Sequence, residues 1–140
     1  MFARLSLFAA VLLATSAMAA PIPPADHEDD PAIYAVVFSA EWCGKCKVLE
    51  PKLMPVMQSM MEDEDVQFVM LDFTDRETTA AAEYTASSLD LAEVYDDNKG
   101  KTGFVLLIRA DSGEVLDTIL SNDDTRSIRS KIQSAVASAS

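Results

Sequence analysis

Four short runs of apolar residues along the chain predict β-strands. They cover residues 33–38, 66–71, 104–108 and 115–120, and are rich in the β-branched and aromatic side chains typical of strands. The second run is nearly continuously apolar, which favours a parallel strand buried on both faces. A turn sequence at residues 110–113 joins the last two runs and indicates a β-hairpin.

Two segments between these strands have the composition and spacing of helices. Residues 45–61 predict a first helix, which Pro51 and Pro55 are expected to kink because proline removes a helical hydrogen bond. Residues 77–95 predict a second helical segment, broken near residues 87–90. A polar loop is expected to follow it.

A final helix is expected to begin near Asn122 or Asp123, because either residue is a good N-cap. Ile128, Ile132 and Val136 recur every four residues and give this helix one apolar face. The order of elements is therefore βαβ, helix, ββ, helix. This order predicts an α/β fold with helices packed against one sheet.

The chain begins with the pattern of a cleaved signal peptide over residues 1–19. Arg4 precedes an apolar run, and small residues at positions 17–19 supply the cleavage site. The apolar run is shorter than the roughly 20 residues that span a bilayer, so an uncleaved anchor is the weaker alternative and no stable membrane insertion is expected. We expect a periplasmic or secreted protein that begins near Ala20, in a compartment where disulfides form.

The rest of the chain has the length of one domain. Residues 20–32, rich in proline and acid, predict an extended lead-in, and residues 33–140 predict the folded domain. The formal net charge of the whole chain is −12. Such acidity argues against nucleic acid or an anionic membrane as a partner, since both require clustered Lys and Arg.

The only two cysteines, Cys43 and Cys46, follow the first predicted strand and open the first predicted helix. A helix N-terminus stabilises a thiolate, and Lys45 adds positive charge nearby, whereas Glu41 opposes it. Gly44 is expected to permit a tight turn into the helix and to leave the sulfur open. A disulfide across three residues closes too small a loop to stabilise the chain through entropy, so a reactive pair is the better interpretation.

Residues 38–51, with the sequence FSAEWCGKCKVLEP, resemble the active-site strand and kinked helix of the thioredoxin family. Residues 104–108 and 113–115 resemble the paired C-terminal strands of that family, and the resemblance covers about residues 33–138. It implies a minimal thioredoxin-like fold with a central four-stranded mixed sheet flanked by helices. The implied activity is thiol–disulfide exchange, with a redox-active disulfide and no other cofactor.

The family pattern implies that Cys43 is the attacking thiol and Cys46 the resolving thiol. Trp42 is expected either to cover the edge of the site or to pack in the core. Thr102 and Gly103 stand where many thioredoxins have a cis-proline before the third strand. Because a non-proline cis bond costs about 2.5–4 kcal/mol, we expect a trans bond before Gly103 and less shielded cysteines.

A second departure from the family pattern is Val37, which replaces the buried acid that relays protons to the resolving thiol of many thioredoxins. Cys46 is therefore expected to exchange its proton with solvent or with another group. This difference places general thioredoxin-type reductase activity in question, while leaving the predicted fold unaffected.

The implied partners are protein thiols or disulfides and a thiol electron donor. Residues 72–75 resemble, more weakly, periplasmic domains that pass electrons from a membrane transporter, so such a transporter is one candidate donor. The sequence does not indicate the direction of the reaction, but the WCGxC pattern resembles reducing members of the family.

Two functions of other classes remain open. One is a copper- or zinc-binding module that uses the two cysteines, and the other is a non-catalytic interaction domain. Four methionines within residues 54–61 offer soft ligands for Cu(I), although core packing is the simpler interpretation of their spacing. His27 is the only histidine, so the chain offers three Cys and His ligands where structural zinc usually has four.

Overall fold

The computed structural model describes residues 30–63 and 65–140. The predicted signal peptide over residues 1–19, His27 and most of the lead-in over residues 20–32 lie outside the described residues and stay predictions. Within the described part of the chain, no helix is both long and apolar enough to cross a membrane.

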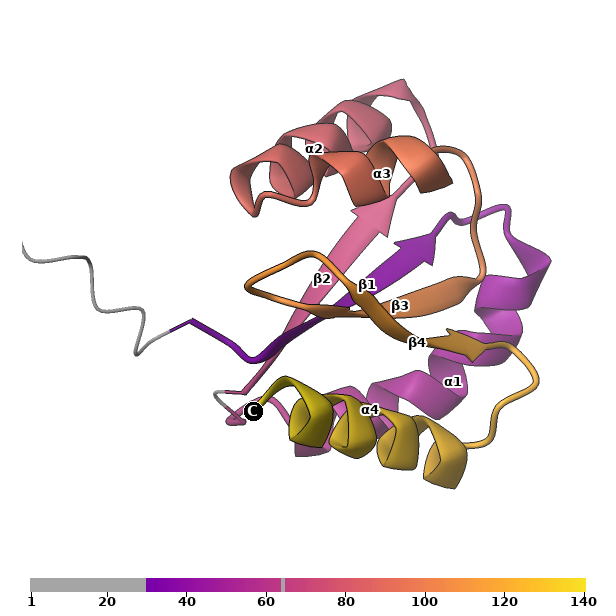
Figure 1. Cartoon of the computed structure of the whole chain (residues 1–140). Coiled ribbons are helices and arrows are strands. Elements are labelled where there is room, and N and C mark those ends of the chain that lie inside the picture. Colours follow the sequence, from indigo (N-terminus) through magenta and orange to yellow (C-terminus); the bar gives the residue numbers. More distant parts are fainter. Residues whose placement is uncertain (1–29, 64) are drawn as a thin grey trace, which may run out of the picture.

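A four-stranded mixed sheet forms the centre of the fold (Figure 1). Its strands lie in the order β2-β1-β3-β4. β1 runs parallel to β2 and antiparallel to β3, which in turn runs antiparallel to β4. The four predicted strands, the hairpin and the α/β fold class are thus confirmed, with the bounds β1 (Ile33–Ser39), β2 (Val66–Asp72), β3 (Phe104–Arg109) and β4 (Val115–Leu120).

Strand β2 forms one edge of the sheet, and the prediction that it is buried on both faces holds only for its first part, where Val66 and Phe68 pack into the core under α1 and α4. Val69 and Leu71 are buried beneath the helices of one face, whereas Met70, which points to the opposite face, is exposed. The covering helix on that opposite face packs against the central strands, so it leaves the carboxyl end of β2 accessible to solvent. Continuous apolarity therefore overstated the burial of this strand.

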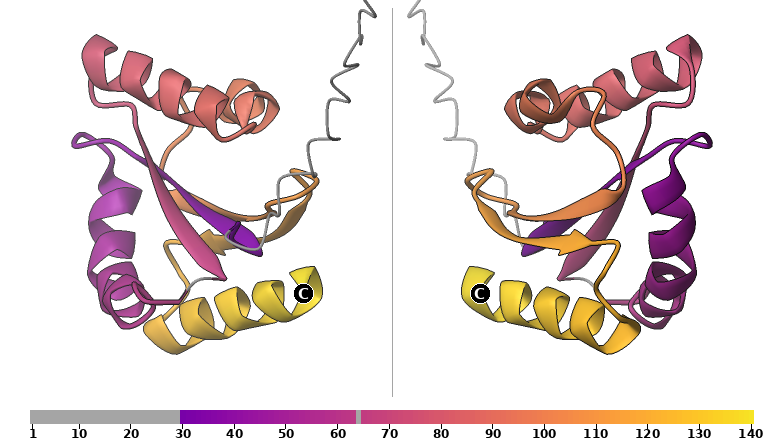
Figure 2. Two further views of the ribbon diagram at one scale, coloured as in Figure 1. Left: turned by 90° about the vertical axis from the view of Figure 1, so that its left-hand side faces the viewer. Right: turned by 90° about the vertical axis from the view of Figure 1, so that its right-hand side faces the viewer.

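Two pairs of helices cover the sheet, one pair on each face (Figure 2). The helices α1 (Gly44–Ser59) and α4 (Thr125–Ala139) pack on one face, and α2 (Arg76–Ser88) and α3 (Ala92–Asn98) pack on the other. β1 supplies alternate side chains to both cores, so all seven of its residues are buried. One central strand thereby holds both layers together.

The predicted helices are confirmed, with differences at their ends. The first ends two residues earlier than predicted, and the break in the second segment lies between α2 and α3, where Asp90 has a φ of 57°. The N-cap of α4 is Asp124, not Asn122 or Asp123. Asp123 instead accepts hydrogen bonds from the Leu120 N–H and the Lys131 ammonium, so its carboxylate does not cap the helix.

The methionines of the first helix and the turn after it divide into two kinds. Met60 is buried and Met57 packs against the core, as the packing interpretation predicts. Met54 and Met61 are exposed, which the same interpretation did not predict. The apolar face of α1 consists mainly of Leu49, Leu53 and Val56.

Candidate functional site

Three chain segments meet at one end of the sheet and build the site. β1 and β2 are parallel, so the segments that follow them emerge at the same end. β3 is antiparallel to β1, and the pairing of Phe38 with Phe104 brings the segment before β3 to that end as well. The rings of Phe73 and Phe104 stack on opposite sides of this junction against Phe38, with centroids 6.2 and 4.7 Å away. The aromatic contacts hold the three segments in register beneath the cysteine pair.

Cys43 and Cys46 form a disulfide at the start of α1. Cys43 is the N-cap of this helix, and its sulfur accepts a hydrogen bond from the Cys46 N–H at 3.1 Å. A sulfur in this position faces unpaired N–H groups and the positive end of the helix dipole, both of which favour its thiolate form after reduction. The predicted position of the pair at a strand-to-helix junction is therefore confirmed.

Both cysteines are buried, with 5% of Cys43 and 3% of Cys46 exposed. The Cys46 sulfur lies 3.8 Å from the Phe38 carbonyl oxygen. In the disulfide this sulfur has no proton, so the contact becomes a hydrogen bond only when the pair is reduced and the Cys46 thiol can donate. The neighbouring carbonyl then favours the protonated form of Cys46, in contrast to the capping position of Cys43.

Gly103 packs directly against the disulfide. Its φ is +91°, its peptide bond is trans, and its N–H donates to the Phe38 carbonyl at 2.8 Å. A Cβ at this position would lie 3.4 Å from the Cys43 sulfur and 2.5 Å from the Lys45 Cβ. The predicted trans bond is confirmed, but the expected loss of shielding is wrong, because the absence of a side chain lets the backbone approach and cover the sulfur.

The other predicted neighbours lie around this contact. Lys45 is exposed, and its aliphatic stem packs over Gly103. Thr102 is partly buried in the segment that leads into β3. Gly44 has neither a left-handed φ nor any atom within 4 Å of the position of an added Cβ, so the turn into α1 does not require glycine there, contrary to prediction.

Trp42 lies at the edge of the site, and the alternative that it packs in the core is wrong. Its side chain is 60% exposed, and its indole N–H donates to the Thr74 carbonyl at 3.2 Å. The Thr74 hydroxyl accepts from the Glu41 N–H and donates to Asp72, while the Thr74 N–H also donates to Asp72. These hydrogen bonds join the loop before α1 to the loop after β2.

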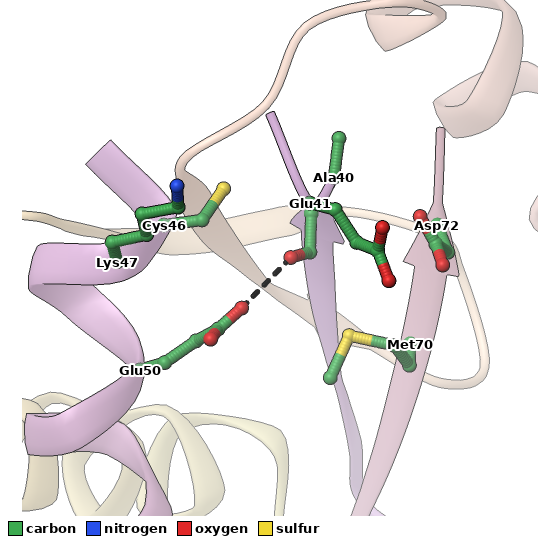
Figure 3. A pocket seen from close by; sticks show the side chains of 8 residues that line it. Ala40, Glu41, Cys46, Lys47, Glu50, Met70 and Asp72 are labelled. Carbon is green, nitrogen blue, oxygen red and sulfur yellow. Dashed lines mark hydrogen bonds between the residues drawn. The ribbon is translucent and has the colours of Figure 1, made fainter. Parts of the chain in front are cut away.

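A cavity of about 360 Å³ opens beside Cys46 (Figure 3). The Ser39 hydroxyl donates to the Glu50 carboxylate at 3.0 Å across it. Figure 3 shows Cys46 and Glu50 extending from α1 toward the ends of β1 and β2. The lining residues come from three elements and the loop after β1: Ser39, Ala40, Glu41, Cys46, Lys47, Glu50, Met70 and Asp72.

Sequence reasoning did not identify Ser39, Glu50, Asp72 or Thr74 as site residues. Glu50 was detectable in principle, because it follows Cys46 by four positions in the predicted helix and such residues share a face. Ser39, Asp72 and Thr74 have no such local signal. Their part in the site depends on the pairing of strands that are distant in sequence.

The arrangement can perform thiol–disulfide exchange. One sulfur is stabilised as a thiolate, the second lies within bonding distance of the first, and the pair can form a disulfide without moving the backbone. Within residues 30–63 and 65–140, no group of three or more His, Cys, Asp or Glu side chains is arranged to hold a metal ion.

Comparisons with known proteins agree with this geometry. Among curated protein sequences, none matches this chain significantly. Three solved structures share the fold, and the matched region covers 74% of this chain in each case. Trxlp from Edwardsiella tarda has 17% sequence identity and a TM-score of 0.50, with 84% of its chain covered, and StoA from Bacillus subtilis has 15% identity and a TM-score of 0.51, also with 84% covered. A thiol:disulfide interchange protein of the thioredoxin family from Chlorobium tepidum has 20% identity and a TM-score of 0.51, with 79% of its chain covered.

A family model also matches the chain. The sequence model named Thioredoxin matches residues 27–102, which is more than half of the chain and includes the cysteine pair. The strand order, the two prolines inside α1 and the disulfide at the helix N-terminus agree with that match. This protein is therefore a member of the thioredoxin family.

Proposed function

We propose that this protein is an exported thiol–disulfide oxidoreductase that reduces disulfides in other proteins. The hydrogen bond from the Cys46 N–H to the Cys43 sulfur supports this proposal most directly, because it distinguishes the two sulfurs chemically. Cys43 is the nucleophile, since the helix N-terminus stabilises its thiolate. Cys46 is the resolving thiol.

The reaction proceeds in two exchanges. The Cys43 thiolate attacks a substrate disulfide, forms a mixed disulfide and releases the first substrate sulfur as a thiolate. The Cys46 thiolate then attacks Cys43, closes the intramolecular disulfide and releases the second substrate sulfur. Two electrons pass from the cysteine pair to the substrate, and the two sulfurs are the only redox groups that the reaction needs.

Each turnover leaves the protein oxidised, so a reductase requires an electron donor. A thiol protein or the exposed dithiol of a membrane electron transporter can reverse the two exchanges. The predicted signal peptide supports a periplasmic or extracellular location for this cycle. The mass of the mature chain tests the predicted export, because cleavage should leave a protein that begins near Ala20.

The reduction potential of the Cys43–Cys46 pair tests the direction. We would equilibrate the protein in glutathione buffers and count alkylated thiols by mass spectrometry. A two-electron transition at about −270 mV supports a reductase, whereas one at about −120 mV indicates an oxidant. Thiols that alkylate only after a metal is removed would contradict the redox function and favour the metal-binding alternative.

A pair of matched variants tests the two roles. Cys46→Ser should accumulate a mixed disulfide with a substrate, because the second exchange is blocked. Cys43→Ser should accumulate much less, since the remaining Cys46 lacks the capping position and faces the Phe38 carbonyl, which favours its protonated form. Equal trapping by the two variants would contradict the assigned roles, and partner binding that survives loss of both cysteines would favour a non-catalytic domain.

A further inference from the structure

The resolving thiol of this protein needs a route for its proton. Only a thiolate attacks a disulfide, so Cys46 must lose a proton before the second exchange. Cys46 is 3% exposed and faces the Phe38 carbonyl, which favours the protonated thiol. Val37 is buried in the core formed with α1 and α4 and has no group that titrates. The proton must therefore pass to a group other than residue 37.

The cavity beside Cys46 provides such groups. It is lined by the Cys46 side chain and by polar groups of Ser39, Glu50 and Asp72. Its volume of about 360 Å³ is large enough for several water molecules, and its polar lining offers them hydrogen-bond partners. A chain of water can thus connect the buried thiol to a carboxylate that lines the same cavity.

Glu50 is placed to receive the proton. It follows Cys46 by one helical turn, so both side chains project from the same face of α1 into the cavity, as Figure 3 shows. The Ser39 hydroxyl donates to its carboxylate at 3.0 Å and holds it toward the end of β1. The residue is otherwise exposed, so Glu50 can return the proton to solvent.

Three other charged groups face the same cavity, and none is placed as well. Asp72, on β2, accepts hydrogen bonds from the N–H and the hydroxyl of Thr74, which direct it toward the loop after β2. Glu41, in the loop after β1, has its carboxylate on the β2 side of the cavity in Figure 3. Lys47, on α1, is a cation and cannot accept the proton of a thiol.

We propose that Glu50, held in place by Ser39, exchanges the proton of the Cys46 thiol through water in the cavity. This inference rests on the proposed function. In the mixed-disulfide state the Cys46 thiol gives its proton to the Glu50 carboxylate. The Cys46 thiolate then forms a bond to the Cys43 sulfur, and the bond between Cys43 and the substrate sulfur breaks. The substrate sulfur leaves as a thiolate, and Glu50 releases the proton to solvent.

The Glu50→Gln variant distinguishes this function from a bystander role, because the two predict opposite effects. A bystander carboxylate near Cys46 disfavours the thiolate by like-charge repulsion, so its removal should speed the second exchange. A proton acceptor speeds that exchange, so its removal should slow it. General base catalysis typically contributes roughly 10²–10⁴-fold, and transfer through water leads us to expect a slowing of at least about tenfold.

A chromogenic aromatic disulfide, 5,5′-dithiobis(2-nitrobenzoate), separates the two exchanges in stopped flow. Attack by Cys43 releases the first equivalent of thionitrobenzoate, and attack by Cys46 on the mixed disulfide releases the second. In Glu50→Gln we expect an unchanged first phase and a slowed second phase near neutral pH. The difference should shrink as the pH rises, because hydroxide then removes the thiol proton without help from a carboxylate. Glu62→Gln, which makes the same charge change in the exposed turn after α1, is the matched control.

Two further measurements separate proton transfer from a structural role. Added imidazole should restore the second phase of Glu50→Gln in proportion to its concentration and leave wild type unchanged, and Glu50→Asp should retain part of the rate. A second phase that is unchanged or faster in Glu50→Gln would overturn the inference. A second phase that is slowed in Asp72→Asn but not in Glu50→Gln would also overturn it. If wild type releases no second equivalent, the proposed function itself fails.

Discussion

The contact between Gly103 and the disulfide predicts that Gly103→Ala destabilises the oxidised protein through two separate effects. The left-handed φ of +91° opposes any L side chain, at a cost of about 1–2 kcal/mol. The added methyl group would also lie 2.5 Å from the Lys45 Cβ, which is fixed to the backbone of α1 and cannot rotate away. Displacing a packed neighbour typically costs about 1–3 kcal/mol, so we expect a total of about 2–5 kcal/mol.

Two other glycines provide matched controls. Gly113 also has a left-handed φ, of +71°, but an added Cβ there would have nothing within 4 Å. Gly113→Ala should therefore show the backbone cost alone, about 1–2 kcal/mol. Gly44 lacks both features, and Gly44→Ala at the start of α1 should be neutral or stabilising by up to about 1 kcal/mol.

Urea unfolding of the three oxidised variants measures these differences. With a denaturant dependence of about 2 kcal/mol per molar urea, the middle of the usual range, the midpoint for Gly103→Ala should fall by about 1–2.5 M. The difference between Gly103→Ala and Gly113→Ala is the cost of the contact with α1. Equal midpoints for these two variants would refute the conclusion that Gly103 is required by its approach to Lys45 and Cys43.

Two predictions concern α4 and the loop before it. Ile132 is fully buried against the sheet, so Ile132→Ala should lower the free energy of unfolding by about 2–5 kcal/mol. Val136 is only partly buried, so Val136→Ala should lower it clearly less. Burial raises the pKa of Asp123, but hydrogen bonds from the Leu120 N–H and from Lys131 outweigh it and hold the pKa below its usual range. Because the folded-state pKa is depressed, the carboxylate stabilises the fold fully above its unfolded pKa of about 3.9, and this contribution is lost as pH falls through the folded pKa. Asp123→Asn should thus destabilise at pH 7 and approach wild type below about pH 4, and a pH-independent difference would contradict this.

The elements of this fold were predictable because their signals are local. Alternating and continuous apolar runs identified all four strands, and a spacing of four identified the buried Ile128 and Ile132 of α4. The cysteine pair was predictable for the same reason. A helix cap involves residues three apart, so the position of Cys43 at the start of α1 follows from its neighbours in sequence.

Helix boundaries were less predictable where several residues compete for one position. Asn122, Asp123 and Asp124 are all good N-caps, and their order in the sequence does not select one. The structure selects Asp124, because Asp123 is held by Lys131 and by the N–H of Leu120 at the end of β4. A contact between two elements thus decided where the last helix begins.

The surroundings of the cysteine pair depended on contacts between distant segments. Trp42 donates a hydrogen bond to Thr74, 32 positions away, and Glu50 accepts one from Ser39, 11 positions away. Gly103 reaches Cys43 only because β3 pairs with β1. Continuous apolarity in β2 likewise could not indicate that the strand forms an edge.

The sequence by itself therefore determined the order of the elements, the family and the reactive pair, because turns, caps and periodic burial depend on neighbouring residues. The tertiary structure alone decided which strand is an edge, what covers the sulfurs and which carboxylate shares a cavity with Cys46. These properties depend on which segments pack together, and the packing is set by the free energy of the whole fold and not by any local pattern.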